Sequence, residues 1–245
     1  MIIAPLCSSS SANSTFIGQR DSGFLIDIGC SYKALRENLA RIGTDVSAVK
    51  AVLITHEHGD HISGLRVFAK NNPDVPIYMG ADVWSAQSKQ VLGCEIMTFN
   101  TSHDALWSVG YVIKYGETKI AYMTDLGTIT PEVEGATLGA DVVFVESNYD
   151  PIMLRNNTRY PGVVKERIKS DVGHLSNGDS ADYILSLAQS GTTRIMLAHL
   201  SRENNTVQTA YRNTADRLAK AGLSLNRDYT LDIASVQTTG EYIAV

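Results

Sequence analysis

The chain has 245 residues, of which 44% are hydrophobic, and its net charge is −5 at pH 7. This length can bury a sizeable core in one domain, and the weak acidic balance gives no general sign of a polyanionic partner. No run approaches the roughly 20 apolar residues of a membrane-spanning helix, and residues 1–6 lack the basic and apolar regions of a secretory signal. We therefore expect one domain over residues 1–245, located in the cytoplasm and with no membrane partner.

Short apolar runs, several rich in valine, isoleucine and tyrosine, recur along the chain and predict β-strands. In chain order they are Ile2–Leu6, Thr15–Gly18, Phe24–Ile28, Val49–Thr55, Ile77–Met79, Ile96–Phe99, Val109–Tyr115, Ile120–Thr124, Val142–Glu146, Arg194–Ala198 and Thr230–Ala234. The serine-rich stretch Cys7–Ser14 predicts a turn, because serine side chains compete for backbone hydrogen bonds.

Apolar residues at helical spacing lie between some of these strands. The predicted helices are a segment that carries Leu35, Leu39 and Ile42 and stops at Gly43, the stretch Asp179–Ala188, and a third from about Asn205 to Ala221. Mixed sheets covered by helices define an α/β protein. The pattern also predicts two halves, the first ending near Thr124 and the second opening near Asp141.

The three cysteines, Cys7, Cys30 and Cys94, are odd in number and widely separated. Such spacing argues against a disulfide framework and against a CxxC metal site. We expect each of them to be a small buried or half-buried side chain.

Three of the six histidines fall in one run, Thr55-His56-Glu57-His58-Gly59-Asp60-His61. A predicted strand ends just before this run and apolar residues at helical spacing follow it, so the run forms a strand-to-helix loop. Alternate residues of an extended stretch face the same way, so His56 and His58 can bind one metal while Asp60 and His61 turn towards a second. We expect Glu57 to be solvated and Gly59 to provide backbone freedom.

The pattern Thr-His-x-His-x-Asp-His-x-x-Gly-Leu, here Thr55–Leu65, resembles the signature of the metallo-β-lactamase superfamily. The resemblance implies a four-layer αβ/βα sandwich, with two metals in the groove where the two sheets meet. It also implies a role for Asp27, which would support the metal loop through hydrogen bonds. The implied ligands are His56, His58 and His103 for the first metal, Asp60, His61 and His199 for the second, and Asp125 for both.

Two classes within this superfamily are less consistent with the sequence. Flavin-linked diiron oxidoreductases of this superfamily have glutamate where His58 stands, and its lactam-cleaving members are exported. Three classes of hydrolase then remain: thioester hydrolases, lactonases and phosphodiesterases that cut nucleic acids.

A further histidine favours the phosphodiesterases. The element Gly173-His174-Leu175-Ser176 resembles the Gly-His-Ser-Thr element of the ribonuclease Z group, where the histidine pairs with a glutamate and assists proton transfer. The matching glutamate is Glu146, and a carboxylate that holds an imidazole raises its basicity. The alternative is that His174 only caps or packs against the helix that follows.

The resemblance is closer still to the bacterial YycJ/WalJ subfamily of nucleases. It spans nearly the whole chain, in the pieces Asn13-Ser14, Ser102-His103-Asp104-Ala105, Glu146-Ser147-Asn148-Tyr149-Asp150, Tyr160-Pro161, Gly173-His174-Leu175-Ser176-Asn177 and Leu197-Ala198-His199-Leu200-Ser201.

The stretch Arg155–Lys169 has five basic residues and one acidic residue in a chain that is acidic overall. It could be a rim that follows the phosphates of a substrate, or a solvated helix face. Tyr149 and Tyr160 flank this stretch and could stack on bases.

Together these resemblances imply a dinuclear metal-dependent nuclease, a 5′-to-3′ DNA exonuclease that uses a metal-bridging hydroxide. Asp60, His174 and Glu146 are its expected catalytic residues. The expected cofactors are two divalent ions, zinc first and manganese or iron as alternatives, and DNA is favoured over RNA as the substrate. The alternatives are a small-molecule thioester or lactone hydrolase of the same fold and a protein that only binds metal.

Overall fold

The computed structural model describes residues 1–80, 88–234 and 243–244. The chain divides into two compact units: unit 1 takes residues 1–97, 105–107 and 234–245, and unit 2 takes 98–104 and 108–233. Among the described residues, no helix has the length and apolar character needed to cross a membrane. The expectation of a single domain stays a prediction.

Unit 1 contains a six-stranded sheet in the order β13-β1-β2-β3-β4-β5. Its strands are β1 (Ile2–Ser9), β2 (Ala12–Gln19), β3 (Ser22–Ile26), β4 (Val49–Ile54), β5 (Ile77–Met79) and β13 (Ile243–Ala244). Strands β1, β2 and β3 pair antiparallel, whereas β3, β4 and β5 pair parallel. The carboxyl ends of β3 and β4 therefore meet at one edge, where the residues that follow each strand can approach one another.

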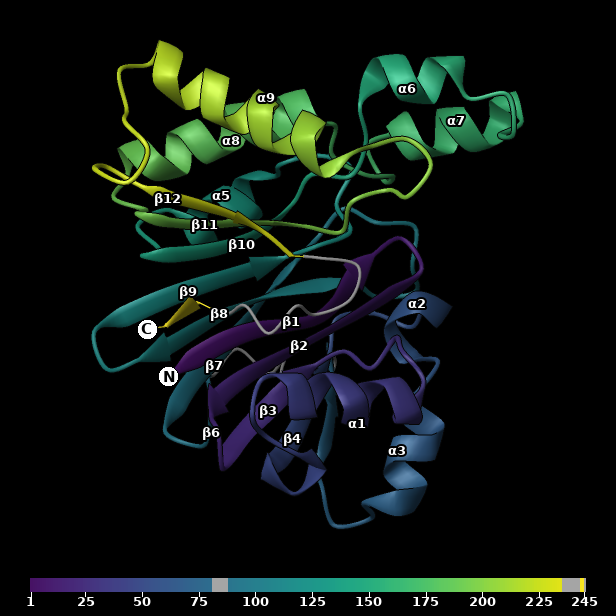
Figure 1. The fold of residues 1–245 in the computed structure, drawn as a ribbon, viewed down its shortest axis with the longest axis vertical. Helices are drawn as coiled ribbons and strands as arrows, with labels where there is room; N and C mark the ends of the chain where they lie inside the picture. The colour runs from purple at the N-terminus through teal and green to yellow at the C-terminus, as the bar shows by residue number, and fades with distance from the viewer. Residues whose placement is uncertain (81–87, 235–242, 245) are drawn as a thin grey trace. The chain divides into compact units, whose positions relative to one another are not determined.

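Helices of unit 1 pack against this sheet. They are α1 (Tyr32–Arg41), α2 (Gly59–Ile62) and α3 (Leu65–Asn71), with a short 3₁₀ turn at Val46–Ala48. Helix α1 begins after Ser31, whose hydroxyl accepts a hydrogen bond from the Ala34 N–H at 3.2 Å. Its buried Leu35 and Leu39 join Phe68 of α3 in one core, and Figure 1 shows both helices beside β3 and β4.

Unit 2 contains a second sheet, in which strands run in the order β12-β11-β10-β9-β8-β7. Its strands are β8 (Val109–Tyr115), β9 (Thr118–Met123), β10 (Val142–Glu146), β11 (Arg194–Ala198) and β12 (Thr230–Ile233). The unit boundary falls inside β7 (Cys94–Asn100), whose first residues pair with β6 (Lys89–Val91) in unit 1. Strands β9 to β12 are parallel, and the register pairs Val145 with both Met123 and Leu197. The carboxyl ends of β9, β10 and β11 are therefore level at one edge.

Five helices of unit 2 are described: α5 (Pro131–Thr137), α6 (Pro151–Asn156), α7 (Gly162–Lys169), α8 (Asn177–Gln189) and α9 (Val207–Lys220). Figure 1 shows α8 and α9 stacked over β10, β11 and β12. Helices α6 and α7 form a separate pair, in which Leu154 of α6 and Ile168 of α7 pack together with Tyr149. Ser176 and Thr206 cap α8 and α9 through their hydroxyls.

The structure confirms the α/β class and each predicted strand and helix, with shifted ends. The turn predicted for Cys7–Ser14 is wrong in extent: β1 and β2 continue through most of it, and only Ser10 and Ser11 form the turn of a hairpin. The predicted boundary near Thr124 is also wrong, because β9 pairs with both β8 and β10 and so belongs to unit 2.

The sequence analysis did not predict several of the helices and strands. Helices α5 and α6 are short, and each begins with a proline at the first helical position after a capping residue, Thr130 or Asp150. That signature was available in the sequence. Helix α7 lies in the basic stretch, and β6 and β13 have only three and two residues. All three cysteines are free and buried, as predicted.

Candidate metal centre

The histidine-rich run of unit 1 forms the predicted strand-to-helix loop. It connects the end of β4 to α2, and it brings three imidazole rings together. The ring centroids of His56 and His58 are 4.7 Å apart, and those of His56 and His61 are 4.1 Å apart. Both His56 and His61 are buried. A short loop thus gathers several nitrogen donors, as a metal site requires.

Asp27 follows β3 and holds this loop. Its Oδ1 accepts a hydrogen bond from the Thr55 N–H at 2.8 Å, its Oδ2 accepts one from the Thr55 hydroxyl at 2.8 Å, and Oδ2 lies 2.8 Å from His61 Nδ1. When Nδ1–H of His61 donates to this carboxylate, Nε2 is the nitrogen available to a metal. Burial raises the pKa of Asp27, although His61 and Thr55 act in the opposite direction.

We expect Asp27→Asn to weaken zinc binding by about 10–100-fold, the range typical of residues that support a metal ligand. The amide cannot accept hydrogen bonds at both of its terminal atoms, so His61 loses its fixed orientation. The melting temperature of the metal-free protein should change little, because burial disfavours the Asp27 carboxylate and the neutral amide removes that cost. Titration with zinc and thermal melts check this. Asp45→Asn, at an exposed cap of the same unit, is the matched control, and equal zinc affinity in both variants would refute the role of Asp27.

Two residues outside the predicted set complete this half of the site. Asn13, at the start of β2, places Nδ2 3.0 Å from His61 Nε2 and 3.3 Å from Asp60 Oδ2. Gly29 is required by space, because a Cβ there would lie 1.6 Å from the Asp60 carbonyl oxygen. The sequence showed Asn13 only as part of a family-like motif, and the contacts of both residues join segments far apart in the chain.

Two minor predictions about the loop are wrong. Gly59 has no neighbour within 4 Å of an added Cβ and no left-handed φ, so the loop does not depend on glycine there. Glu57 is not simply solvated, because its Oε1 accepts a hydrogen bond from the Leu106 N–H at 2.7 Å.

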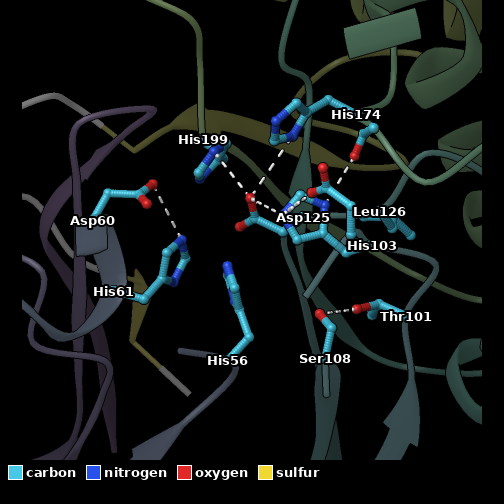
Figure 2. Close-up of polar contacts among 12 residues, drawn as sticks. His56, Asp60, His61, Thr101, His103, Ser108, Asp125, Leu126, His174 and His199 are labelled. Atoms are coloured by element: carbon cyan, nitrogen blue, oxygen red, sulfur yellow. Dashed lines mark hydrogen bonds and ion pairs between the residues drawn. The ribbon is translucent and has the colours of Figure 1, made fainter. Parts of the chain in front are cut away.

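In unit 2, three imidazoles surround the carboxylate of Asp125 (Figure 2). Asp125 Oδ1 lies 3.3 Å from His199 Nε2, 3.6 Å from His103 Nε2 and 3.7 Å from His174 Nδ1. The Nδ1 of His103 lies 3.1 Å from the Gly173 carbonyl oxygen, so Nδ1–H donates there and Nε2 faces Asp125. Burial lowers the pKa of His103, which keeps the ring in the neutral form that binds metals.

This group suits a divalent cation. Asp125, Glu146, His174 and His199 each place one possible ligand atom within 4.8 Å of the others. Ligand atoms about 2.0–2.1 Å from a tetrahedral zinc ion are about 3.3 Å from one another, and His199 Nε2 and Asp125 Oδ1 have that separation, 3.3 Å. Buried imidazole and carboxylate donors are the ligands that zinc, manganese and iron accept.

Strained backbone places the key side chains at the strand ends. Asp125 follows β9 with φ 58°, and His199 follows β11 with φ 54°; Asp27, after β3 in unit 1, has φ 61°. A residue with a Cβ pays about 1–3 kcal/mol in such a conformation, which persists only where its surroundings hold it. Backbone outliers of this kind are concentrated at functional sites.

Next to this group, His174 and Glu146 form the predicted pair. Their Nδ1 and Oε1 atoms are 2.7 Å apart, and Glu146 is fully buried. Glu146 Oε2 accepts hydrogen bonds from the N–H groups of Leu126 at 3.1 Å and Leu175 at 3.4 Å. Burial lowers the pKa of His174, but Glu146 and Asp125 outweigh it and raise the pKa to about 9. In the metal-free chain, His174 is therefore an imidazolium at neutral pH.

We expect Glu146→Gln to bring the pKa of His174 from about 9 to its ordinary value of 6.5 or below in metal-free protein. The glutamine oxygen is required by the two backbone N–H groups, so its amide nitrogen faces His174 and opposes the charged ring. NMR titration of the imidazole checks this, with Glu132→Gln on α5 as control.

The same shift gives a stability effect with a defined sign. The pKa of His174 is higher in the folded chain than in the unfolded chain, so protonation of His174 stabilises the folded wild type. This contribution is fully present below pH 6.5 and is lost as the pH rises through about 9. The Glu146→Gln variant should lack that pH dependence, and a variant that keeps it would contradict the pairing.

The basic stretch of unit 2 runs from the end of α6 through the whole of α7, and several of its charges are already paired. Arg167 bonds Asp104 through two nitrogens, Arg159 lies 2.7 Å from Glu203, and Lys169 lies 2.8 Å from Glu166. The side chains of these three basic residues are 46–75% exposed. Such pairs are weak and can exchange their partners for phosphates.

Comparisons with known proteins identify the class. The metallo-beta-lactamase superfamily model matches residues 9–99, and the beta-lactamase superfamily domain model matches residues 81–200. Relatives that are 32% identical over almost the whole chain extend the match, so the chain belongs to the metallo-β-lactamase superfamily.

Within the superfamily, those relatives belong to the YycJ/WalJ group that the sequence analysis predicted. Exodeoxyribonuclease YycJ from Bacillus anthracis is 32% identical, with 92% of each chain covered. Exodeoxyribonuclease WalJ from Streptococcus pneumoniae serotype 2 is also 32% identical, with 95% of this chain and 94% of that protein covered.

Solved structures confirm the fold. The metallo-beta-lactamase fold protein YhfI from Bacillus subtilis aligns with a TM-score of 0.68 at 14% identity, covering 96% of this chain and 97% of that one. Zinc-bound PqqB from Methylobacterium extorquens aligns with a TM-score of 0.65 at 16% identity, covering 100% of both chains.

Proposed function

We propose that this protein is a dinuclear metal-dependent phosphodiesterase, a 5′-to-3′ exonuclease that acts on DNA. The observation that carries the proposal is the buried Glu146–His174 pair beside the Asp125 cluster, because it adds a proton donor to a metal-binding group. The names of the YycJ and WalJ relatives support DNA as the substrate. No observation on this chain favours the thioester or lactone alternative.

We propose two divalent cations as cofactors, zinc first and manganese or iron as alternatives. When bound, such ions lower the pKa of water towards neutrality and stabilise charge on an attacked phosphate. The proposed ligands are His56, His58 and His103 for the first ion, Asp60, His61 and His199 for the second, and Asp125 for both.

Residues of this chain supply the proton that the leaving 3′-oxygen needs. A phosphodiester is cleaved when water adds to phosphorus, losing one proton to solvent, and the bond to the 3′-oxygen breaks with its electron pair. The departing 3′-oxygen therefore carries a negative charge and takes up one proton. His174 is protonated at neutral pH and held through Nδ1 by Glu146, so Nε2–H can give its proton to the leaving oxygen. Asp60 would be a catalytic residue by helping to hold the second ion. Asp27 keeps the loop of His56 and His61 in place.

The proposed location is the cytoplasm. The three cysteines are free, as is typical of a reducing compartment. DNA is also the substrate that such a compartment offers to an exonuclease.

The test is an assay of metal-reconstituted protein on single- and double-stranded DNA and RNA labelled at either end. We expect release of mononucleotides from the 5′ end of DNA, and a slower reaction on RNA. Hydrolysis of thioesters or lactones in the same preparations, with all four nucleic acids intact, would replace this proposal with the small-molecule alternative.

A further inference from the structure

The backbone carbonyl of His199 has a dedicated partner. Asn148, two residues after β10, donates its side-chain N–H to this oxygen at 2.8 Å. The backbone carbonyl of Asn148 in turn accepts the N–H of Ser201 at 2.8 Å. One residue therefore holds both sides of the turn that carries His199 with its left-handed φ of 54°. Both Asn148 and His199 are buried.

Asn148 is itself fixed from two directions. Its N–H donates to the Leu175 carbonyl at 3.0 Å, next to His174. Asn205 donates from Nδ2 to the carbonyls of Asn148 and Ser147, both at 2.9 Å. These bonds tie the end of β10 to the His174 loop and to the start of α9.

A third buried asparagine completes the cluster. Asn177, at the start of α8, donates from Nδ2 to Asn205 Oδ1 at 2.9 Å, and its Oδ1 accepts the Ser147 hydroxyl at 2.7 Å. We call Asn148, Asn177 and Asn205 the asparagine cluster. Because buried amides are costly unless bonded, a hydrogen-bonded group of three specifies one arrangement of the segments it joins.

The cluster reaches the proposed metal ligands through the backbone of one of them, at the His199 carbonyl. Without the bond from Asn148, the carbonyl of His199 loses a partner in a buried position, and the strained φ loses its support. The ring would then leave the position in which Nε2 lies 3.3 Å from Asp125 Oδ1.

We propose that Asn148 is a positioning residue for the metal site, which fixes the backbone of His199 so that its imidazole and the Asp125 carboxylate can share an ion. The proposal rests on the proposed function in one respect, namely that His199 is a metal ligand. It goes beyond that function because it assigns a role to a residue outside the proposed ligands and catalytic residues.

The test is zinc affinity, measured on full-length protein by competition with a chromophoric chelator. Asn148→Ala should weaken zinc binding by about 10–100-fold, as is typical when a residue that orients a ligand is removed. The matched control is Asn38→Ala in unit 1, because Asn38 is also buried and also donates to a backbone carbonyl, that of Leu6, at 2.8 Å. The control should lower the melting temperature but leave zinc affinity within about twofold of the wild type.

A double-mutant cycle with His199→Ala isolates the mechanism. If Asn148 acts through His199, adding Asn148→Ala to His199→Ala should not weaken zinc binding further. Equal zinc affinity in the Asn148→Ala and Asn38→Ala variants would overturn the role of Asn148 but not the proposed function. The same conclusion would follow if Asn148→Ala weakened zinc binding as much in the His199→Ala background as in the wild type. An unchanged zinc affinity in His199→Ala itself would overturn the proposed ligand set together with the inference.

Should Asn148→Ala fail to fold, Asn148→Ser provides the same test. Serine is small and tolerates burial, but its hydroxyl is too short to reach the His199 carbonyl. The expected result is again weaker zinc binding than in the Asn38→Ala control, and wild-type affinity would reject the role of Asn148.

Discussion

Asp125→Ala is expected to remove bound zinc and to lower kcat/KM for DNA by at least about a thousandfold, well beyond the 10–100-fold typical of residues that only support a ligand. Its Oδ1 lies 3.3–3.7 Å from three imidazoles, those of His103, His174 and His199. Without that carboxylate, the nitrogen donors of unit 2 lose the anion that lies near all three of them and balances the charge of a cation.

Metal content by atomic emission and exonuclease rates measure this effect. Asp125→Asn is the second variant, because asparagine tolerates the left-handed backbone at φ 58° and so separates backbone strain from the loss of charge. Asp141→Ala is the control, since Asp141 precedes β10 and accepts a hydrogen bond from the Lys119 N–H. Full zinc content and activity in both Asp125 variants would refute the proposed centre.

His174→Ala has the second largest expected effect, a loss of about 10²–10⁴-fold in kcat on DNA, the usual contribution of a general acid. Zinc content should stay at the wild-type value, because His174 is proposed to carry a proton and not to bind metal. The 2.7 Å contact with Glu146 and the pKa of about 9 keep the ring charged for this task.

A substrate with a good leaving group makes this experiment specific. A nitrophenyl ester of a nucleotide releases nitrophenolate, a stable anion that needs no proton to leave. His174→Ala should therefore retain most of the wild-type rate on this substrate. His174 is also close enough to Asp125, Glu146 and His199 to bind an ion with them. Loss of zinc in His174→Ala, with equal losses on both substrates, would make it a ligand and contradict the proton-donor role.

The sequence predicted the strands and the histidine loop well, for local reasons. The loop residues are contiguous, so their spacing and the strand before them were enough to predict which side chains gather. The Glu146–His174 pair was predicted only through family resemblance, because 27 residues separate the two side chains and local periodicity carries no information on their contact.

The supporting contacts could not be predicted in this way. Asn13 approaches His61, and Asn148 approaches the turn at His199, only because strands far apart in the chain pair in one register. The two compact units are a similar case. The place of β9 in unit 2 depends on its pairing with β8 and β10, and an apolar run does not specify its neighbour.

The left-handed backbone at Asp125 and His199 creates a conflict between what folding prefers and what the proposed metal site needs. Glycine would relieve about 1–2 kcal/mol of backbone strain at each position. Selection for thermal stability alone would therefore favour glycine there and remove the proposed metal ligands. Retention of aspartate and histidine at these two corners therefore distinguishes a working enzyme from a merely well-folded descendant, even where the rest of the chain has diverged.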